Sequence, residues 1–362
     1  MKIAKILGCI AATGLAVCLG AGLWFNHAYN GVRAMPDVKV MVITPGSPVN
    51  KIADELHAQG IIGNPLAFKI GARYHQILYP ERSALKAGEY ELPSAASARD
   101  ILRILRAGDT LQRRLTIPEG LMAIEIVELI NKADGMTGQI ADIPREGSLL
   151  PETYHFTRGT DRNDLIVRMQ KAMDTTIEEL WQKRTEDLPF STIEEAVTLA
   201  SIVEKETAQP AERPRVAGVF VNRLRKDMKL QTDPTVIYAL TEGKSRLNRP
   251  LTRVDILRNQ SPYNTYYVRG LPPGPIANPG YASLAATLNP EVNEYFYFVA
   301  DGTGGHAFAK THIQHVRNVN KWRQFQREQK NLAKEAAITD EDTGGVQDED
   351  AIIETGAPDS QE

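Results

Sequence analysis

An uncharged stretch near the N-terminus constrains the fold of this chain more than any other feature. The run Ile6–Phe25 is twenty residues without a charged side chain, and Lys2 and Lys5 precede it. A helix of this length can cross a bilayer, and the flanking lysines favour a cytoplasmic N-terminus. We therefore predict a retained single-pass anchor over residues 1–30. A cleaved signal peptide is the alternative, and both would place the rest of the chain outside the cytoplasm.

The two ends of the chain also limit how the remainder is stabilised and what it binds. Both cysteines, Cys9 and Cys18, lie inside the uncharged run, so the exported part cannot form an internal disulfide. Residues 336–362 carry nine acidic and no basic side chains, which predicts a disordered acidic tail. Without these nine charges, the formal net charge of −3 becomes about +6 for residues 1–335. A mildly basic body suits an anionic polymer but lacks the basic stripe expected for nucleic acid.

Short strands alternate with helices in the first half of the chain. Three segments run from a strand-like piece to a proline and then into an amphipathic helix: MVITPGSPVNKIADEL, YELPSAASARDILRIL and RRLTIPEGLMAIEIVEL. Each helix carries an apolar pair four residues apart, as one buried face requires: Ile52 and Leu56, Ile101 and Leu105, Ile126 and Ile130. The pattern predicts an α+β or mixed α/β fold.

The first of these copies belongs to a small predicted domain, residues 31–112. Its order of strand, helix, helix and strand resembles a LysM-like module, the βααβ fold associated with N-acetylated glycans. The alternative is a generic α+β adaptor without affinity for glycans, because short βααβ patterns are weak evidence of function.

Residues 113–335 form a larger predicted domain of mixed type. We predict helices near residues 163–185, 191–208, 212–227 and 312–333, and a strand over 294–300. After Leu230 the chain is rich in loops, and the run GLPPGPIANPG excludes both a helix and a central strand. Long shaped loops of this kind often line binding sites.

Two glutamates, Glu204 and Glu206, lie two residues apart in the helix that a capping box, Ser191 to Glu194, is expected to open. Counting 100° per residue places both on the apolar side, with Glu206 at its rim, whereas Lys205 points to solvent. A partly desolvated carboxyl at a rim has a raised pKa and can donate a proton near neutral pH. The alternative is that both glutamates are structural and pair with Arg213, Arg215 or Arg223.

Six motifs occur in a fixed order across the second half: ASIVEKET, VFVNRL, LQTDPTVIYAL, YNTY, GLPPGPIANPG and FVADGTGGHAF. Together they closely resemble the YceG-like family of endolytic murein transglycosylases, and six ordered motifs are more specific than any single one. The resemblance covers roughly residues 45–319 and also the N-terminal anchor. It implies an inner (plasma) membrane protein with its catalytic domain in the periplasm or cell-wall space. Nascent peptidoglycan glycan strands are the implied substrate, and peptidoglycan synthases (penicillin-binding proteins) are candidate partners.

The resemblance also implies an activity and a catalytic residue. Such enzymes cut the β-1,4 bond between N-acetylmuramic acid and N-acetylglucosamine, leave a 1,6-anhydro-muramic acid end, and so terminate glycan chains. By the E-K-E motif, the catalytic acid falls on Glu206, and Glu204 would be a buried supporting acid that holds Arg223 or a loop. The rival hypothesis is a non-enzymatic scaffold that binds peptidoglycan within the cell-wall synthesis machinery. Such a scaffold has no need for an acid at a cleft rim.

Polar and aromatic side chains in the loop motifs suit contacts with a glycan. We predict this role for Gln231, Thr232, Asp233, Tyr263, Asn264, Tyr266 and His306. The alternative for these residues is turn or other structural chemistry, because Thr-Asp-Pro and Tyr-Asn-Thr are common in loops. Three histidines, His306, His312 and His315, invite a zinc site, but no carboxylate stands at a suitable ligand spacing. We therefore predict no metal and no other cofactor.

Overall fold

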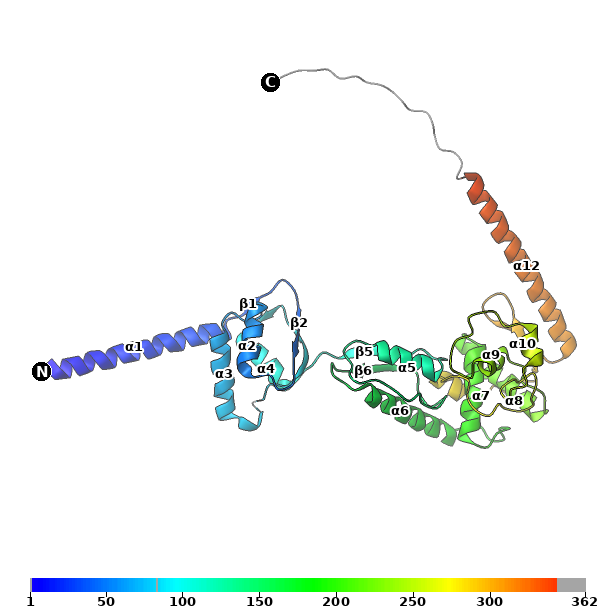
Figure 1. The fold of residues 1–362 in the computed structure, drawn as a ribbon, viewed down its shortest axis with the longest axis horizontal. Helices are drawn as coiled ribbons and strands as arrows, with labels where there is room; N and C mark the ends of the chain where they lie inside the picture. Colours follow the sequence, from blue (N-terminus) through cyan, green and yellow to red (C-terminus); the bar gives the residue numbers. More distant parts are fainter. Residues whose placement is uncertain (1, 83, 344–362) are drawn as a thin grey trace, which may run out of the picture. The chain divides into compact units, whose positions relative to one another are not determined.

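The computed structural model describes residues 2–82 and 84–343. The chain divides into two compact units. Unit one comprises the chain up to Pro118 together with Ile124–Pro144 and Pro151–Ala172, and unit two comprises Glu119–Ala123, Arg145–Leu150 and the chain from Met173 onward. Figure 1 traces the elements along the chain.

Unit one begins with the apolar helix and continues into the βααβ segment. Its elements are α1 (Lys2–Asn30), β1 (Arg33–Ala34), β2 (Lys39–Ile43), α2 (Val49–Ala58), α3 (Pro65–Leu78), the 3-10 turn η1 (Pro80–Arg82), β3 (Gly88–Leu92), β4 (Ala95–Ala96) and α4 (Ala98–Ala107). Strand β2 pairs antiparallel with β3, from Lys39 opposite Leu92 to Ile43 opposite Gly88. The order β2–α2–α3–β3 confirms the predicted strand–helix–helix–strand pattern, while the LysM-like assignment stays a prediction.

The core of this part of unit one follows from helix periodicity. Ile52 and Leu56 of α2 and Ile101 and Leu105 of α4 are all fully buried, as the four-residue spacing predicted. Helix α4 starts at a capping box, in which the Ser97 side chain accepts from the Asp100 backbone N–H and Asp100 accepts from the Ser97 N–H. Local signals in the sequence therefore fix both the start and the inward face of this helix.

The third strand-proline-helix copy lies in the next segment. It contains β5 (Arg113–Thr116), α5 (Ala123–Lys132), β6 (Thr153–Phe156) and α6 (Arg162–Gln182). Strand β5 pairs antiparallel with β6, from Arg113 opposite Phe156 to Thr116 opposite Thr153. The predicted inward pair on α5, Ile126 and Ile130, is fully buried.

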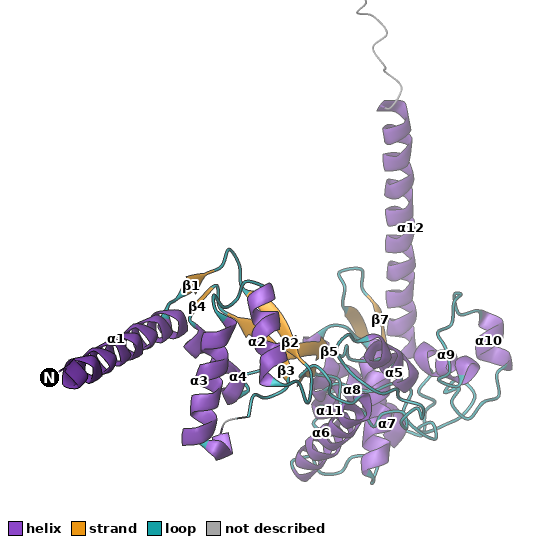
Figure 2. Ribbon diagram, turned by 60° about the vertical axis from the view of Figure 1, so that its left-hand side comes forward, coloured by secondary structure: helices purple, strands orange, loops and turns teal. Residues whose placement is uncertain are grey.

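Unit two is mainly helical, with one hairpin. From Met173 onward its elements after α6 are α7 (Ile193–Glu206), η2 (Pro210–Glu212), α8 (Arg213–Arg225), α9 (Asp233–Thr241), α10 (Arg253–Arg258), α11 (Tyr281–Leu288), β7 (Tyr297–Ala300), β8 (His306–Ala309) and α12 (His312–Thr343). Helices α7, α8 and α11 pack on one another, and β7 pairs antiparallel with β8. Every named sheet in the described residues has two strands, and Figure 2 shows how small they are beside the helices. A mixed α+β fold is confirmed.

One prediction about these helices was wrong in detail and one feature was not foreseen, whereas Lys205 is exposed as predicted. The capping box of α7 uses Thr192 and Glu195 rather than Ser191 and Glu194, one residue later than expected. Eight consecutive residues of α7, from Ala196 to Val203, are buried, so this helix has no solvent-facing stripe along its middle. The reason is that neighbours cover α7 on more than one side, which a helical wheel cannot foresee.

The last helix also differs from the expectation. Helix α12 continues to Thr343, ten residues past the predicted end at residue 333 and into the segment predicted as an acidic tail. The rest of that predicted tail, residues 344–362, lies outside the described residues. At the other end of the chain, Lys5–Asn30 is long and apolar enough to cross a membrane, a property that a signal sequence shares.

Candidate active site

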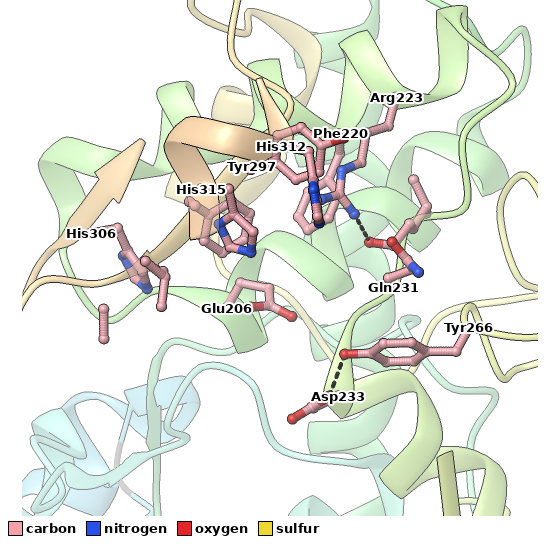
Figure 3. Close-up of a pocket in the computed structure, with 14 residues that line it drawn as sticks. Glu206, Phe220, Arg223, Gln231, Asp233, Tyr266, Tyr297, His306, His312 and His315 are labelled. Atoms are coloured by element: carbon pink, nitrogen blue, oxygen red, sulfur yellow. Dashed lines mark hydrogen bonds between the residues drawn. The ribbon is translucent and has the colours of Figure 1, made fainter. Parts of the chain in front are cut away.

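A cavity of about 520 Å³ opens in unit two at the C-terminal end of α7. The cavity collects side chains from α7, α8, α9, the segment between α8 and α9, Tyr266, the β7–β8 hairpin and α12. The lining residues are Glu206, Phe220, Arg223, Leu230, Gln231, Asp233, Tyr266, Tyr297, Phe298, Val299, Ala300, His306, His312 and His315. Figure 3 shows the Glu206 carboxyl between a group of histidines and the Asp233–Tyr266 pair.

Glu206 is the last residue of α7, and the helix ends there because Thr207 adopts an extended backbone. Burial raises the pKa of the Glu206 carboxyl to about 7, and the negative charge of Asp233 pushes in the same direction. The Thr232 hydroxyl and the Arg223 guanidinium favour the charged form and oppose this rise. Near neutral pH the carboxyl is therefore divided between its acid and base forms, which suits a group that first donates and then accepts a proton.

Glu204 lies two residues before Glu206 in α7 and has a different environment. Its side chain is 5% exposed, and its Oε1 accepts from Arg213 Nη2 at 3.1 Å. Its Oε2 accepts from the backbone N–H of Gly280 at 3.0 Å, at the end of the proline-rich loop. Arg213 in turn donates to Glu119 Oε2 at 2.9 Å. Both oxygens of Glu204 thus make structural contacts, with Arg213, one of the three expected partners, and with the loop, as predicted. The suggested partner Arg223 was wrong.

Arg223 instead faces the cavity of Glu206. Its guanidinium donates to the carbonyl oxygens of Phe296 and Leu230, both at 2.6 Å, and lies 5.4 Å from the centre of the Tyr297 ring. From the sequence, Arg223 was expected only as a structural partner of a glutamate. An arginine inside the apolar helix pattern VFVNRL was the available signal, because a buried guanidinium must find acceptors.

The start of α9 and the residues just before it supply another part of the cavity wall. Gln231 lines the cavity and has a left-handed backbone with φ of 51°, an uncommon conformation for a residue other than glycine. Asp233 also lines the cavity, and its Oδ1 accepts from the Tyr266 hydroxyl at 2.7 Å. Thr232 is buried behind them, and its N–H donates to Thr265 Oγ1 at 3.0 Å. The predicted residues Gln231, Asp233 and Tyr266 therefore meet at the cavity that Glu206 lines.

Two of the predicted binding residues lie elsewhere. Asn264 is fully buried, and its Nδ2 donates to the carbonyl oxygens of Ile256 and Asn259 at 2.9 and 2.6 Å. Its amide is occupied in shaping the loop, so it cannot contact a glycan in this conformation. Tyr263 lines a second cavity, of about 380 Å³, where its ring lies 4.8 Å from that of Tyr238.

The β7–β8 hairpin and α12 complete the cavity with aromatic and imidazole rings. His306 begins β8, and its Nδ1 lies 2.7 Å from Glu212 Oε2. His315 stacks on Tyr297 with ring centres 5.2 Å apart, and burial lowers the pKa of its imidazole. In the sequence, His312 and His315 suggested only metal ligands, although histidines three apart on a helix also present one shared surface.

Comparison with known proteins assigns the chain to a class. A sequence model of the YceG-like family matches residues 41–321, so the chain belongs to the YceG-like family. The Bacillus subtilis (strain 168) protein named endolytic murein transglycosylase is 32% identical over 312 residues, which cover 77% of this chain and 83% of that protein.

A Streptococcus pneumoniae (strain D39) protein of the same name is also 32% identical, over 353 residues. The match covers 83% of this chain and 62% of the pneumococcal protein, so this chain spans less than two thirds of that relative. A crystal structure of a YceG-like protein from Listeria monocytogenes has 32% sequence identity and a TM-score of 0.47, with coverage of 78% of this chain and 99% of that one.

Proposed function

We propose that this protein is a lytic transglycosylase that cuts within peptidoglycan glycan strands. The observation that carries the proposal is the Glu206 carboxyl, buried at the wall of a cavity with a pKa of about 7. Relatives of the chain at 32% identity are named endolytic murein transglycosylases. A buried carboxyl with a raised pKa is the acid–base group that such a reaction needs. The bond cut would be the β-1,4 link between N-acetylmuramic acid and N-acetylglucosamine.

The proposed reaction uses Glu206 twice. Protonated Glu206 donates its proton to the glycosidic oxygen as the bond from that oxygen to C1 of the muramic acid breaks. The 6-hydroxyl of the same sugar then bonds to C1, and the Glu206 carboxylate takes up the hydroxyl proton. The products are a free 4-hydroxyl on the leaving sugar and a 1,6-anhydro end, and Glu206 returns to its starting form.

The surroundings of Glu206 suit this single-carboxyl scheme. A hydrolase needs a second carboxylate as nucleophile or to activate water. The nearest candidate is Asp233, which lines the same cavity but accepts a hydrogen bond from the Tyr266 hydroxyl. In the proposed reaction Asp233 keeps the Glu206 proton in place through its negative charge, because that charge raises the pKa of Glu206.

The glycan would contact the other polar groups of this cavity. We assign sugar binding to Gln231, Asp233, Tyr266 and His306, which line the cavity. Tyr263 would meet a sugar farther along an endolytic substrate, in the second cavity. Helix α9 and the 263–266 loop contribute to both cavities, since Tyr238 and Tyr263 line the second and Asp233 and Tyr266 line the first.

The N-terminal part of the chain would hold this activity at the wall. We propose that residues 1–30 form a retained inner-membrane anchor, that residues 31–112 form a LysM-like glycan-binding domain, and that residues 113–335 form the catalytic domain. Release of the full-length protein from membranes by high salt would contradict the anchor. Unchanged binding to peptidoglycan sacculi after deletion of residues 31–112 would favour an adaptor. Synthase partners would be tested by co-purification.

Mass analysis of glycan products tests the central proposal. Purified uncrosslinked glycan strands incubated with the wild-type protein should yield anhydro-muramic ends, each lighter by one water than a reducing end. Glu206→Gln should reduce cleavage by at least about 10²-fold, and Glu178→Gln, an exposed carboxyl on α6, should leave it unchanged.

Three outcomes would redirect the proposal. Reducing ends would identify a hydrolase and make Asp233 the candidate second carboxylate. A folded Glu204→Gln protein without activity, beside an active Glu206→Gln protein, would reverse the two roles. Absence of cleavage together with tight glycan binding by the wild-type protein would favour the scaffold.

A further inference from the structure

Glu212, which does not line the cavity, is hydrogen-bonded to His306, which does. The His306 ring lines the cavity, and Glu212, the last residue of η2, holds this residue at two points. Glu212 Oε1 accepts from the His306 backbone N–H at 2.9 Å, and its Oε2 lies 2.7 Å from His306 Nδ1. Both side chains are only 17% exposed, so water competes weakly for these hydrogen bonds.

The glycine-rich hairpin turn leaves room for the Glu212 carboxylate to approach the backbone beside His306. A Cβ on Gly305 would lie 2.8 Å from Glu212 Oε1, so the carboxylate can approach the backbone only because this residue has no side chain. Gly302 and Gly304 have φ of 93° and 94°, which few other residues adopt. Asp301 Oδ1 closes the turn by accepting from the Thr303 N–H at 2.8 Å. The motif DGTGGH thus builds a turn that presents His306 to Glu212.

The same glutamate connects the hairpin to the segment that follows Glu206. The Thr207 hydroxyl, directly after Glu206, lies 3.5 Å from Glu212 Oε2. Gln209 Nε2 donates to the Gly304 carbonyl at 3.2 Å. His306 is therefore held against the chain segment that ends the helix of Glu206.

The pairing also decides which ring nitrogen of His306 carries a proton. An ionised carboxylate only accepts hydrogen bonds, so the proton of a neutral imidazole must reside on Nδ1, beside Glu212. The other nitrogen, Nε2, then presents a lone pair, and it makes no hydrogen bond to any residue that the structure describes. A bare Nε2 on a ring that lines the cavity is an acceptor for a hydroxyl group of a bound ligand.

We propose that Glu212 is a positioning residue, which holds His306 so that its Nε2 accepts a hydrogen bond from a sugar hydroxyl of the glycan beside Glu206. The inference rests on the proposed function, because it takes the ligand of the cavity to be a glycan. The proposed role is separate from the proton transfer by Glu206, because Glu212 does not line the cavity and acts by fixing the tautomer of His306.

The substitution Glu212→Gln tests this role. The amide is of equal size, and its oxygen can still accept from the His306 N–H, but its NH₂ group would then donate to Nδ1. The neutral His306 ring should therefore move its proton to Nε2. Full-length protein labelled with ¹⁵N-histidine, in detergent at alkaline pH, reports this as an exchange of the two ring nitrogen shifts. His306→Gln identifies the signal among the seven histidines of the chain.

Activity and binding give the second readout. Cleavage of uncrosslinked glycan strands should fall about 10-fold or more in Glu212→Gln and in His306→Gln, and the double variant should be no worse than either, because one acts through the other. In the Glu206→Gln background, adding Glu212→Gln should weaken binding of the same strands roughly 3- to 10-fold, as expected for one lost hydrogen bond. Glu178→Gln, an exposed carboxyl on α6, should change neither.

Gly305→Ala provides a second way to separate Glu212 from His306. The added Cβ should push Glu212 Oε1 away without altering either side chain of the pair. A folded Glu212→Gln protein with full activity, an unchanged His306 tautomer, or additive losses in the double variant would each overturn the inference. A wild-type protein that does not cleave glycan would defeat the proposed function instead. The binding and tautomer measurements would then still decide whether Glu212 acts through His306.

Discussion

Replacing Glu206 with glutamine should stabilise the protein, and by an amount that grows with pH. The carboxyl has a pKa of about 7 in the folded state, against an ordinary value of 4.5. Below pH 4.5 the group is neutral in both folded and unfolded chains, so it resembles glutamine and the two proteins should be equally stable. As pH rises from 4.5 to 7, the unfolded chain ionises freely while the buried carboxyl resists, and the wild type loses stability.

The magnitude follows from these two pKa values. Each pH unit between 4.5 and about 7 corresponds to about 1.4 kcal/mol, so the wild type should fall behind Glu206→Gln by about 3 kcal/mol at pH 7.5 and above. The deficit should then remain constant, because both states are ionised. This cost is the expected counterpart of an acid kept protonated near neutral pH for chemistry.

Urea unfolding of the detergent-solubilised full chain, at several pH values between 4.5 and 8.5, measures this difference. The transition of unit two should be followed separately, because two compact units need not unfold together. Glu178→Gln, on the exposed side of α6, should stay within about 0.5 kcal/mol of the wild type at every pH. A Glu206→Gln effect that does not change with pH would refute the conclusion that burial controls this carboxyl.

Three further predictions concern the same region. Cleavage at limiting substrate should decrease about tenfold per pH unit above pH 7, because only protonated Glu206 can donate to the glycosidic oxygen; a flat profile to pH 9 would exclude this role. Glu204→Ala should lower the unfolding free energy by about 1–3 kcal/mol, because Arg213 and the Gly280 N–H lose an acceptor, and an unchanged urea midpoint would contradict this. Asn264→Ala should also cost about 1–3 kcal/mol, measured in the same way, and any loss of glycan binding should disappear at temperatures where the variant is fully folded.

Short-range patterns in the sequence were sufficient for most of the helices and for their inward faces. The pairs Ile52 and Leu56 or Ile101 and Leu105 are buried because residues four apart share one side of a helix whatever that helix packs against. The uncharged N-terminal run and the proline-rich loop are equally local signals. The same kind of local signal marked Glu204 and Glu206 together, since a carboxyl among apolar helix residues requires either a partner or a function, and only the resemblance to the YceG-like family singled out Glu206.

The identity of each partner depended on the tertiary structure. Arg213 and Arg223 are ten residues apart on α8, or about 15 Å along a helix, so Glu204 can reach only one of them. Which one it reaches depends on how α7 and α8 cross. Asn264 and Tyr263 are neighbours in the chain, yet the backbone of their loop buries one amide and turns the other ring toward a second cavity.

The clearest case is the pair of Glu212 and His306, which are 94 residues apart in sequence. Nothing in either local segment marks them as partners, because a carboxylate and an imidazole can each be satisfied by water or by many other groups. The sequence determined that both residues exist, and that glycines 302, 304 and 305 allow a tight turn beside the histidine. Only the folded chain, by bringing η2 against the β7–β8 hairpin, decided that one holds the other, since hydrogen bonds form between groups that packing places within about 3 Å.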